Sequence, residues 1–340
     1  MKFNRFLLLP FALFYRIIVI FRNVAFDLKI IPSYKIQNKS ICVGNLTVGG
    51  TGKTPMTMYL TDILKKEFKI AIISRGYKRK SKGFLKITNK SSVLQSGDEP
   101  MIYHNNFKET VDVYVSEKRK KAVDFVEKSN NQTIIILDDA LQHRYIQAGL
   151  NILMTNYSSP FYNDFILPSG RLREPKSGAQ RSQIIVINNC PSNISNQEKN
   201  EVRKKLAKYN STIFFARYSY RNPIPFGKAS TFKNNVLFIS GIANHHLFTQ
   251  SIEISGDRDS IIFQDHHTYT KTDIELIHEK FDNFADEWSI LTTEKDFVKL
   301  IEGEKDWKID CYPWFYLPIR LKIDEEEKFN NLIKSYVRNI

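Results

Sequence analysis

Cysteine is scarce in this chain of 340 residues. Its three cysteines, Cys42, Cys190 and Cys311, lie far apart and have neither the paired spacing of a zinc site nor the even count of a small disulfide scaffold. Zinc-finger, RNP-type aromatic and basic recognition-helix patterns are also missing, which argues against a nucleic-acid-binding module despite a net charge of +14. The sequence shows no internal repeat and no low-complexity tract. These absences indicate a globular protein of a reducing compartment.

A long uninterrupted hydrophobic run is missing as well. The most apolar segment covers residues 6–21, but Arg16 interrupts it before it reaches the roughly 20 apolar residues of a membrane span. No small-residue cleavage site follows, which disfavours a secretory signal. We predict that residues 1–30 form an amphipathic helix in the membrane interface, with a buried first helix as the alternative. Its charged residues Arg16, Arg22 and Lys29 would reach lipid headgroups, and its apolar residues Phe11, Phe14, Ile18 and Phe21 would enter the acyl boundary.

The composition that remains is that of a large α/β protein. Hydrophobic types make up 42% of the chain, and the length favours two domains. The excess of 50 Lys and Arg over 36 Asp and Glu favours phosphate-rich partners such as nucleotides or an anionic membrane leaflet. A polar stretch with Pro223, Pro225 and Gly227 reads as a linker. We therefore predict a larger domain at residues 31–220, a linker at 221–235 and a smaller α/β domain at 236–340.

Short β-rich runs alternate with helical patterns from residue 40 onward. Continuous apolar strands separated by helices indicate a doubly wound, mostly parallel sheet covered on both faces. Ligands of such sheets bind at the carboxyl ends of the strands. The predicted strands are residues 41–44, 70–74, 111–115, 133–137, 151–155 and 184–188, and then 236–240, 260–263, 289–292 and 314–323. Helices are predicted at residues 53–68, 117–128 and 272–284 and after the last strand.

A glycine-rich loop, NLTVGGTGKT at residues 45–54, follows the first of these strands and opens a helix. This strand, loop and helix context is that of a phosphate-binding P-loop, in which backbone N–H groups curl around phosphate oxygens. Lys53 would neutralise the charge of the β- and γ-phosphates, and the Thr54 hydroxyl would ligate Mg²⁺. We therefore predict ATP and Mg²⁺ as ligands, although Thr47 stands where the motif usually begins with glycine. The predicted nucleotide-binding residues are Thr47, Val48, Gly49, Gly50, Thr51, Gly52, Lys53 and Thr54.

Two carboxylates end the apolar strand at residues 133–137. Asp138 and Asp139 would lie at the sheet edge where the nucleotide binds, and either can hold the metal as a strand-terminal Asp does in P-loop enzymes. We favour Asp138. A surface turn with two capping acids is the alternative.

Six segments place the chain beside a known family. They are SRGY at 74–77, GDEP at 97–100, LDDALQHR at 137–144, LPSGRLREP at 167–175, FQDHH at 263–267 and TTEKD at 292–296. In this order, over roughly residues 1–300, they resemble the tetraacyldisaccharide 4′-kinases, or lipid A 4′-kinases. Ala140 and Leu141 depart from the Gly-Phe expected there, which could alter packing beside the metal site. The family's loop carries Ser or Thr at the position of Thr47.

The resemblance implies an activity and a location. The γ-phosphoryl group of ATP would pass to the 4′-hydroxyl of a tetraacylated glucosamine disaccharide 1-phosphate, a lipid A precursor of lipopolysaccharide biosynthesis. The protein would be attached to the cytoplasmic face of the bacterial inner membrane, without an obligate protein partner. Two α/β lobes would hold the active site in the cleft between them.

The resemblance also suggests a catalytic pair. A sugar hydroxyl is a weak nucleophile, so a carboxylate or imidazole must take its proton. Asp98 is implied to form a dyad with a histidine of the second lobe, for which His266 matches best and His267 is the rival. Which member of the dyad takes the proton stays open. Glu99 is expected to help to position the metal.

Three further residues are predicted to bind the substrate: Arg171, Arg173 and Tyr77. The two arginines can offer planar donor forks either to the substrate 1-phosphate or to the γ-phosphate of ATP. Tyr77 adjoins a basic stretch at residues 78–82 that would meet acidic headgroups or the lipid phosphate. The alternative of another class is a P-loop ATPase or switch acting on another membrane-associated partner, which would hydrolyse nucleotide without lipid.

Overall fold

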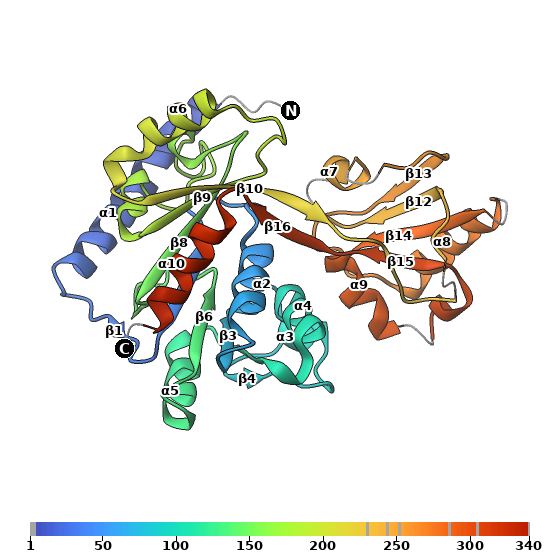
Figure 1. Cartoon of the computed structure of the whole chain (residues 1–340), viewed down its shortest axis with the longest axis horizontal. Coiled ribbons are helices and arrows are strands. Elements are labelled where there is room, and N and C mark those ends of the chain that lie inside the picture. Colours follow the sequence, from blue (N-terminus) through green and yellow to red (C-terminus); the bar gives the residue numbers. More distant parts are fainter. Residues whose placement is uncertain are drawn as a thin grey trace.

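The computed structural model describes residues 5–228, 231–242, 245–250, 253–284, 287–303 and 306–338. Two large sheets organise these residues, one of nine strands and one of five (Figure 1). In Figure 1 the two sheets lie at opposite ends of the molecule, and the long strands β10 and β16 run from one to the other. We call the two halves the large lobe and the small lobe.

The nine-stranded sheet of the large lobe is mostly parallel, as predicted. Its seven central strands run parallel, and the two outermost strands are antiparallel to their neighbours. The order is β16 (Ile319–Ile323), β10 (Thr212–Tyr220), β9 (Ile184–Asn188), β8 (Leu150–Asn156), β2 (Ser40–Gly44), β6 (Ile134–Asp138), β3 (Ile70–Ser74), β5 (Asp112–Val115) and β4 (Leu85–Lys86). The strand β1 (Tyr34–Lys35) pairs separately with β7 (Ile146–Gln147).

Helices cover both faces of this sheet, because successive strand side chains point to opposite faces. Ile41 and Val43 of β2 join one apolar cluster, and Cys42 between them joins the other. The first face is covered by α2 (Lys53–Leu64), α4 (Asp98–Phe107) and α10 (Glu326–Arg338), and the second by α5 (Arg119–Ser129) and α6 (Asn196–Leu206). The short helix α3 (Val93–Ser96) precedes α4. The doubly wound architecture predicted from the sequence is thus confirmed.

The small lobe repeats this plan with fewer elements. Its strand order is β11 (Ile224–Pro225), β15 (Trp314–Leu317), β14 (Trp288–Thr293), β12 (Asn235–Ser240) and β13 (Arg258–Ile262), all parallel except β11. The helices are α7 (His245–Thr249), α8 (Lys271–Asp282) and α9 (Glu294–Leu300). Apolar clusters lie on both faces of this sheet too.

The end of the chain differs from the prediction. The single strand expected at residues 314–323 is interrupted at Pro318, which has no N–H to donate to a ladder. β15 stays in the small sheet, whereas β16 pairs with β10 in the large sheet, and Phe329 and Ile333 of α10 are fully buried in the large lobe. Residues 319–338 therefore return to the large lobe instead of belonging to the small one. The division into independent domains stays a prediction.

The first long helix, α1 (Leu9–Asp27), exposes apolar side chains. It is long and apolar enough to cross a membrane by length and composition alone, and only 17% of it is buried. Phe11, Phe14 and Phe21 are each about two-thirds exposed or more, whereas Val19 and Phe26 are buried against the large lobe. The alternative of a buried first helix does not fit these exposures.

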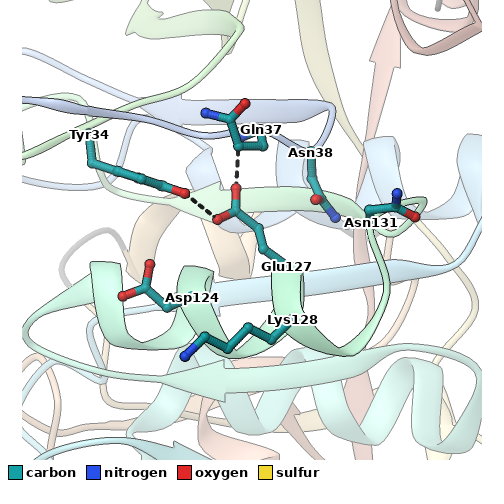
Figure 2. A pocket seen from close by; sticks show the side chains of 7 residues that line it. All are labelled: Tyr34, Gln37, Asn38, Asp124, Glu127, Lys128 and Asn131. Carbon is teal, nitrogen blue, oxygen red and sulfur yellow. Dashed lines mark hydrogen bonds between the residues drawn. The ribbon is translucent and has the colours of Figure 1, made fainter.

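The segment between α1 and β2 is hydrogen-bonded to α5. The Tyr34 hydroxyl and the Gln37 backbone N–H each donate to the Glu127 carboxylate, both at 2.6 Å (Figure 2). The bond from the Tyr34 hydroxyl to Glu127 raises the pKa of Tyr34 to about 12. A cavity of about 340 Å³ lies among these side chains. The two hydrogen bonds to Glu127 hold the segment that leads into β2 against α5.

Candidate active site

The P-loop bends sharply between β2 and α2. Gly52 has φ of +92°, and a Cβ there would lie 2.2 Å from Asn188 Nδ2, so only glycine fits. Asn188 Nδ2 donates to the Thr51 carbonyl at 3.1 Å, and Asn156 Nδ2 donates to the Gly50 carbonyl at 2.9 Å. Asparagines at the carboxyl ends of β8 and β9 thus fix the loop in the shape that phosphate binding requires.

The segment LPSGRLREP supports the start of the loop. The Val48 N–H donates to the Arg171 carbonyl at 2.8 Å, and Thr47 forms a β-bridge with Leu172. The guanidinium of Arg171 pairs with Asp164 at 2.7 Å and does not line the cavity described below. Arg171 therefore contacts the glycine-rich loop through its backbone, and its predicted role in binding a phosphate stays a prediction.

Asp139 is held by cations at the end of β6. Arg173 donates to both of its carboxylate oxygens, at 2.8 and 3.2 Å, and Lys53 Nζ lies 3.9 Å away. Burial alone would raise the pKa of Asp139, but Lys53 and Arg173 outweigh it and lower the pKa to about 2. Asp139 therefore keeps its charge and positions the P-loop lysine.

The surroundings of Asp138 raise the pKa of its carboxyl group, whereas those of Asp139 lower it. Burial, and then the charge of Asp139, raise the pKa of Asp138 to about 7. Ser74 donates to Oδ2 at 3.1 Å, whereas Oδ1 is buried without a partner. A buried carboxylate oxygen without a hydrogen-bond partner among the described residues, in a cavity that Thr54 also lines, fits a hard divalent cation that takes oxygen ligands.

The structure brings Asp98 and His266 together, although they are 168 residues apart. Asp98 begins α4, and its Oδ2 lies 3.0 Å from His266 Nδ1. His266 follows β13 with a left-handed backbone, φ of 61°, and its N–H donates to the Gly241 carbonyl. Burial would raise the pKa of Asp98, but the bond to His266 and the nearby Lys299 and Lys295 lower it. The carboxylate is therefore ionised at neutral pH.

The rival histidine has another partner. His267 Nε2 lies 3.0 Å from Asp273 Oδ2, and its ring stacks on Phe263 inside the small lobe. Of the two histidines, His266 is the one that contacts Asp98.

One cavity of about 1000 Å³ gathers the predicted residues from both lobes. Of the predicted residues, Arg171 and Asp98 do not line it, and Asp98 reaches the cavity edge through its bond to His266. The large lobe contributes the P-loop residues 47–54 with Tyr77, Glu99, Asp138, Asp139 and Arg173, and the small lobe contributes Asp265, His266 and Lys295.

Several residues of the site were not predicted. Lys295 Nζ lies 3.0 Å from His266 Nε2, and Arg119 donates to the Asp139 carbonyl at 2.8 Å. Gln142 donates both to the Asn45 carbonyl and to Glu174, which joins the P-loop to the LPSGRLREP segment. Lys295 and Gln142 lie inside the segments that carry the family resemblance, so the motif TTEKD was a usable signal for Lys295. Arg119 had none.

Leu141, at the departure from the family pattern, is buried in the core of the large lobe. A Cβ on Gly44 would lie 2.5 Å from the Leu141 Cβ, so the two backbones pack closely at the end of β2. Neither Ala140 nor Leu141 lines the cavity. The two residues that differ from the family pattern therefore change no side chain that lines the cavity. Their effect on the site stays a prediction.

A nucleotide-phosphate loop that faces an acid–histidine pair across one cavity can bring a phosphoryl donor and a hydroxyl acceptor together. This arrangement defines the class of P-loop kinases. Within that class, the family model described as LpxK, tetraacyldisaccharide-1-P 4′-kinase, matches residues 4–338, and the chain belongs to this family.

Similar proteins agree with this assignment. A tetraacyldisaccharide 4′-kinase of Flavobacterium psychrophilum is 39% identical, covering 100% of this chain and 98% of that protein. One of Bacteroides thetaiotaomicron is 36% identical, covering 97% and 93%. The crystal structure of the "apo" form of LpxK from Aquifex aeolicus in complex with ATP is 29% identical, with a TM-score of 0.74 and coverage of 98% of this chain and 99% of that one. The family, the fold class and the kinase class predicted from the sequence are confirmed.

Proposed function

We propose that this chain uses ATP and Mg²⁺ to phosphorylate the 4′-hydroxyl of tetraacyldisaccharide 1-phosphate, at the cytoplasmic face of the inner membrane. One observation carries the proposal: His266 of the small lobe, which contacts Asp98 of the large lobe, lines the same cavity as Lys53, Asp138 and the P-loop. Donor phosphates bound at the loop would thus lie opposite a group that accepts a proton.

The transfer follows from the charges that the cavity presents. Lys53, the P-loop N–H groups and Arg173 stabilise the charge that develops on the γ-phosphoryl group. The Asp98–His266 pair takes the proton of the sugar 4′-hydroxyl while the 4′ oxygen bonds to the γ-phosphorus. The bond from that phosphorus to the β-phosphate oxygen breaks and releases ADP. Because the reacting groups lie between two lobes, closure around them would exclude water and limit hydrolysis.

The metal belongs beside Asp138. Its unpartnered Oδ1 and the Thr54 hydroxyl supply oxygen ligands, and Glu99 faces the same cavity from the start of α4. Mg²⁺ held by these residues would supply positive charge that offsets the negative charge of the nucleotide phosphates. Asp139 already binds Lys53 and Arg173, so its role is to hold these cations in place.

Helix α1 supports a lipid as the acceptor. Its exposed side chains include Phe11, Phe14 and Phe21, while Arg22 of the same helix lines the cavity. Tyr77, 57% exposed, stands at the cavity and packs edge-on against the His266 ring. A substrate whose acyl chains stay in the membrane beside α1, while its phosphorylated sugar enters the cavity, would fit both of these features.

The test is transfer of radiolabelled phosphate from ATP to tetraacyldisaccharide 1-phosphate in detergent with Mg²⁺. We expect label in the lipid, little ATP hydrolysis without it, and strongly reduced transfer by a Lys53→Ala control. Hydrolysis at the same rate with and without lipid, with no labelled lipid, would favour the ATPase or switch instead.

A further inference from the structure

A loop of the large lobe, residues 76–83, lies after β3 beside the cavity, and we call it the rim loop. Its residues Tyr77 and Lys78 line the cavity, and both are exposed. The Tyr77 ring meets the His266 ring of the small lobe edge-on, with the two centroids 5.4 Å apart. Lys78 Nζ lies 5.9 Å from the centroid of the Tyr77 ring. An aromatic ring beside an ammonium group suits a ligand that combines a sugar with a phosphate.

One arginine, Arg79, joins the rim loop to the segment after β5. Its side chain is only 2% exposed. Its Nη2 donates to the Gly83 carbonyl, and it also donates to Glu117 Oε1 at 2.6 Å. The Gly83 N–H donates to the other carboxylate oxygen of Glu117 at 3.0 Å. Because Glu117 lies two residues after β5, these bonds connect the far end of the loop to the large sheet.

The start of the rim loop packs closely around the same arginine. Gly76 has φ of +69°, and a Cβ there would lie 2.5 Å from Arg79 Cδ and 2.7 Å from the Ser96 carbonyl oxygen. The Lys80 N–H donates to the Leu94 carbonyl of α3 at 2.7 Å. With Arg79 in place, the loop is therefore held against both α3 and the segment after β5.

The bonds of Arg79 suit a positioning role better than a stabilising one. Arg79 Nε and Nη1 are buried without a hydrogen-bond partner among the described residues, and such donors cost free energy. Replacing a buried ion pair by apolar side chains is often neutral for stability or stabilising. Glu117 is 41% exposed, so water would solvate its charge if Arg79 were removed. Folding alone thus gives little reason for a buried guanidinium here, whereas its bonds determine the course of the loop.

We propose that Arg79, paired with Glu117, is a positioning residue that holds the rim loop so that Tyr77 and Lys78 face the phosphorylated sugar of the acceptor. The inference rests on the proposed function and deepens it, because it names what fixes the acceptor side of the cavity. Without the ion pair, Tyr77 and Lys78 would have to be ordered when the acceptor binds, which weakens binding. The nucleotide side is independent of the pair, since asparagines of β8 and β9 hold the P-loop.

Hydrogen exchange of the full chain, measured by mass spectrometry without ligands, reports whether the pair holds the loop. The variant is Arg79→Met, which keeps an apolar stem but cannot donate a hydrogen bond. We expect faster exchange in peptides that cover residues 76–84, because the N–H groups of Lys80 and Gly83 lose their fixed acceptors. Exchange in peptides that cover the P-loop, residues 45–54, should not change.

Kinetics show whether the loop serves the acceptor. In Arg79→Met, KM for tetraacyldisaccharide 1-phosphate should rise by about 10-fold, because two side chains must be ordered on binding. KM for ATP and kcat should change little. Glu117→Gln removes the charge of the partner and should raise the same KM. The double variant should lose no more than Arg79→Met alone, because the two residues act through one ion pair.

The control is Lys86→Met, which removes a 2.6 Å ion pair with Asp112 between β4 and β5 and should change neither the exchange of the loop nor KM. Unchanged exchange of the loop in Arg79→Met, an unchanged KM for the lipid, or an equal rise in KM for ATP would overturn the role of Arg79. If Arg79→Met does not fold, Glu117→Gln decides by the same measurements. If the wild type transfers no phosphate to the lipid, the proposed function fails, whereas hydrogen exchange still decides whether the pair holds the loop.

Discussion

Replacing Asp138 by Asn should stabilise the metal-free protein at alkaline pH while it abolishes phosphotransfer. Burial raises the pKa of Asp138 from 3.8 to about 7, so the folded protein binds more protons than the unfolded chain between these values. Its stability therefore falls as the pH rises through that window. The pKa difference corresponds to about 4 kcal/mol at most once the carboxylate is fully ionised. Asn keeps an acceptor for Ser74 but leaves an NH₂ at the unpartnered Oδ1 position, a cost of about 1–3 kcal/mol. A net gain of roughly 1–3 kcal/mol should remain.

Urea unfolding with a chelator present, at about pH 8 and about pH 5, measures this gain. At the lower pH the wild-type carboxyl is protonated, so the advantage of Asp138→Asn should vanish or reverse there. The control is Asp257→Asn, at an exposed residue directly before β13, which should show no such pH dependence. A variant less stable than the wild type at pH 8, or equally favoured at both pH values, would refute the reasoning.

Three further predictions concern the phosphate loop, the membrane helix and the dyad. Lys53→Ala should lower kcat by about 10²- to 10³-fold, and a near-normal kcat would exclude the P-loop role. Deleting residues 1–24 should move the protein from vesicles to the soluble fraction in flotation, because the exposed aromatic side chains are lost; unchanged flotation at high salt would contradict this. Asp98→Asn should slow the chemical step by about 10²- to 10⁴-fold with ATP affinity preserved. Adding His266→Ala should cost much less than the product of the two single losses, and fully multiplicative losses would contradict the dyad.

The parts of the fold that could be predicted are those with local signals. Continuous apolar runs such as IIIL in β6 predicted buried parallel strands, and the loop at residues 45–54 predicted its own helix. The strand β10 was not predicted, since its second half, which extends beyond β9 and pairs with β16, is more polar and only partly buried. Its partner β16 lies about 100 residues further along the chain, so no local pattern could show the pairing.

The same limit applies to the site. Asp138, Asp139 and the P-loop follow strands whose ends meet at one sheet edge, so their proximity could be predicted. Asp98 and His266 came from the family resemblance, because residue types alone give no sign that an acidic turn and a histidine pair will meet. Lys295 lies inside a recognised motif, but its 3.0 Å contact with His266 forms only when the small lobe brings α9 beside the loop after β13.

Two buried carboxylates, Asp138 in the cavity and Asp98 beside it, differ in charge because their neighbours differ. Asp98 meets His266 and two lysines, which together outweigh burial and keep it ionised. Asp138 lies beside the charge of Asp139 and accepts one hydrogen bond, from Ser74, so burial dominates and raises its pKa. Asp138 therefore favours the protonated form as long as no cation is bound. Binding of a divalent metal would displace that proton and ionise Asp138. Asp98 is ionised without such an event. If Asp138 holds the metal and the Asp98–His266 pair accepts the substrate proton, the two environments separate these roles, as phosphoryl transfer to a hydroxyl requires.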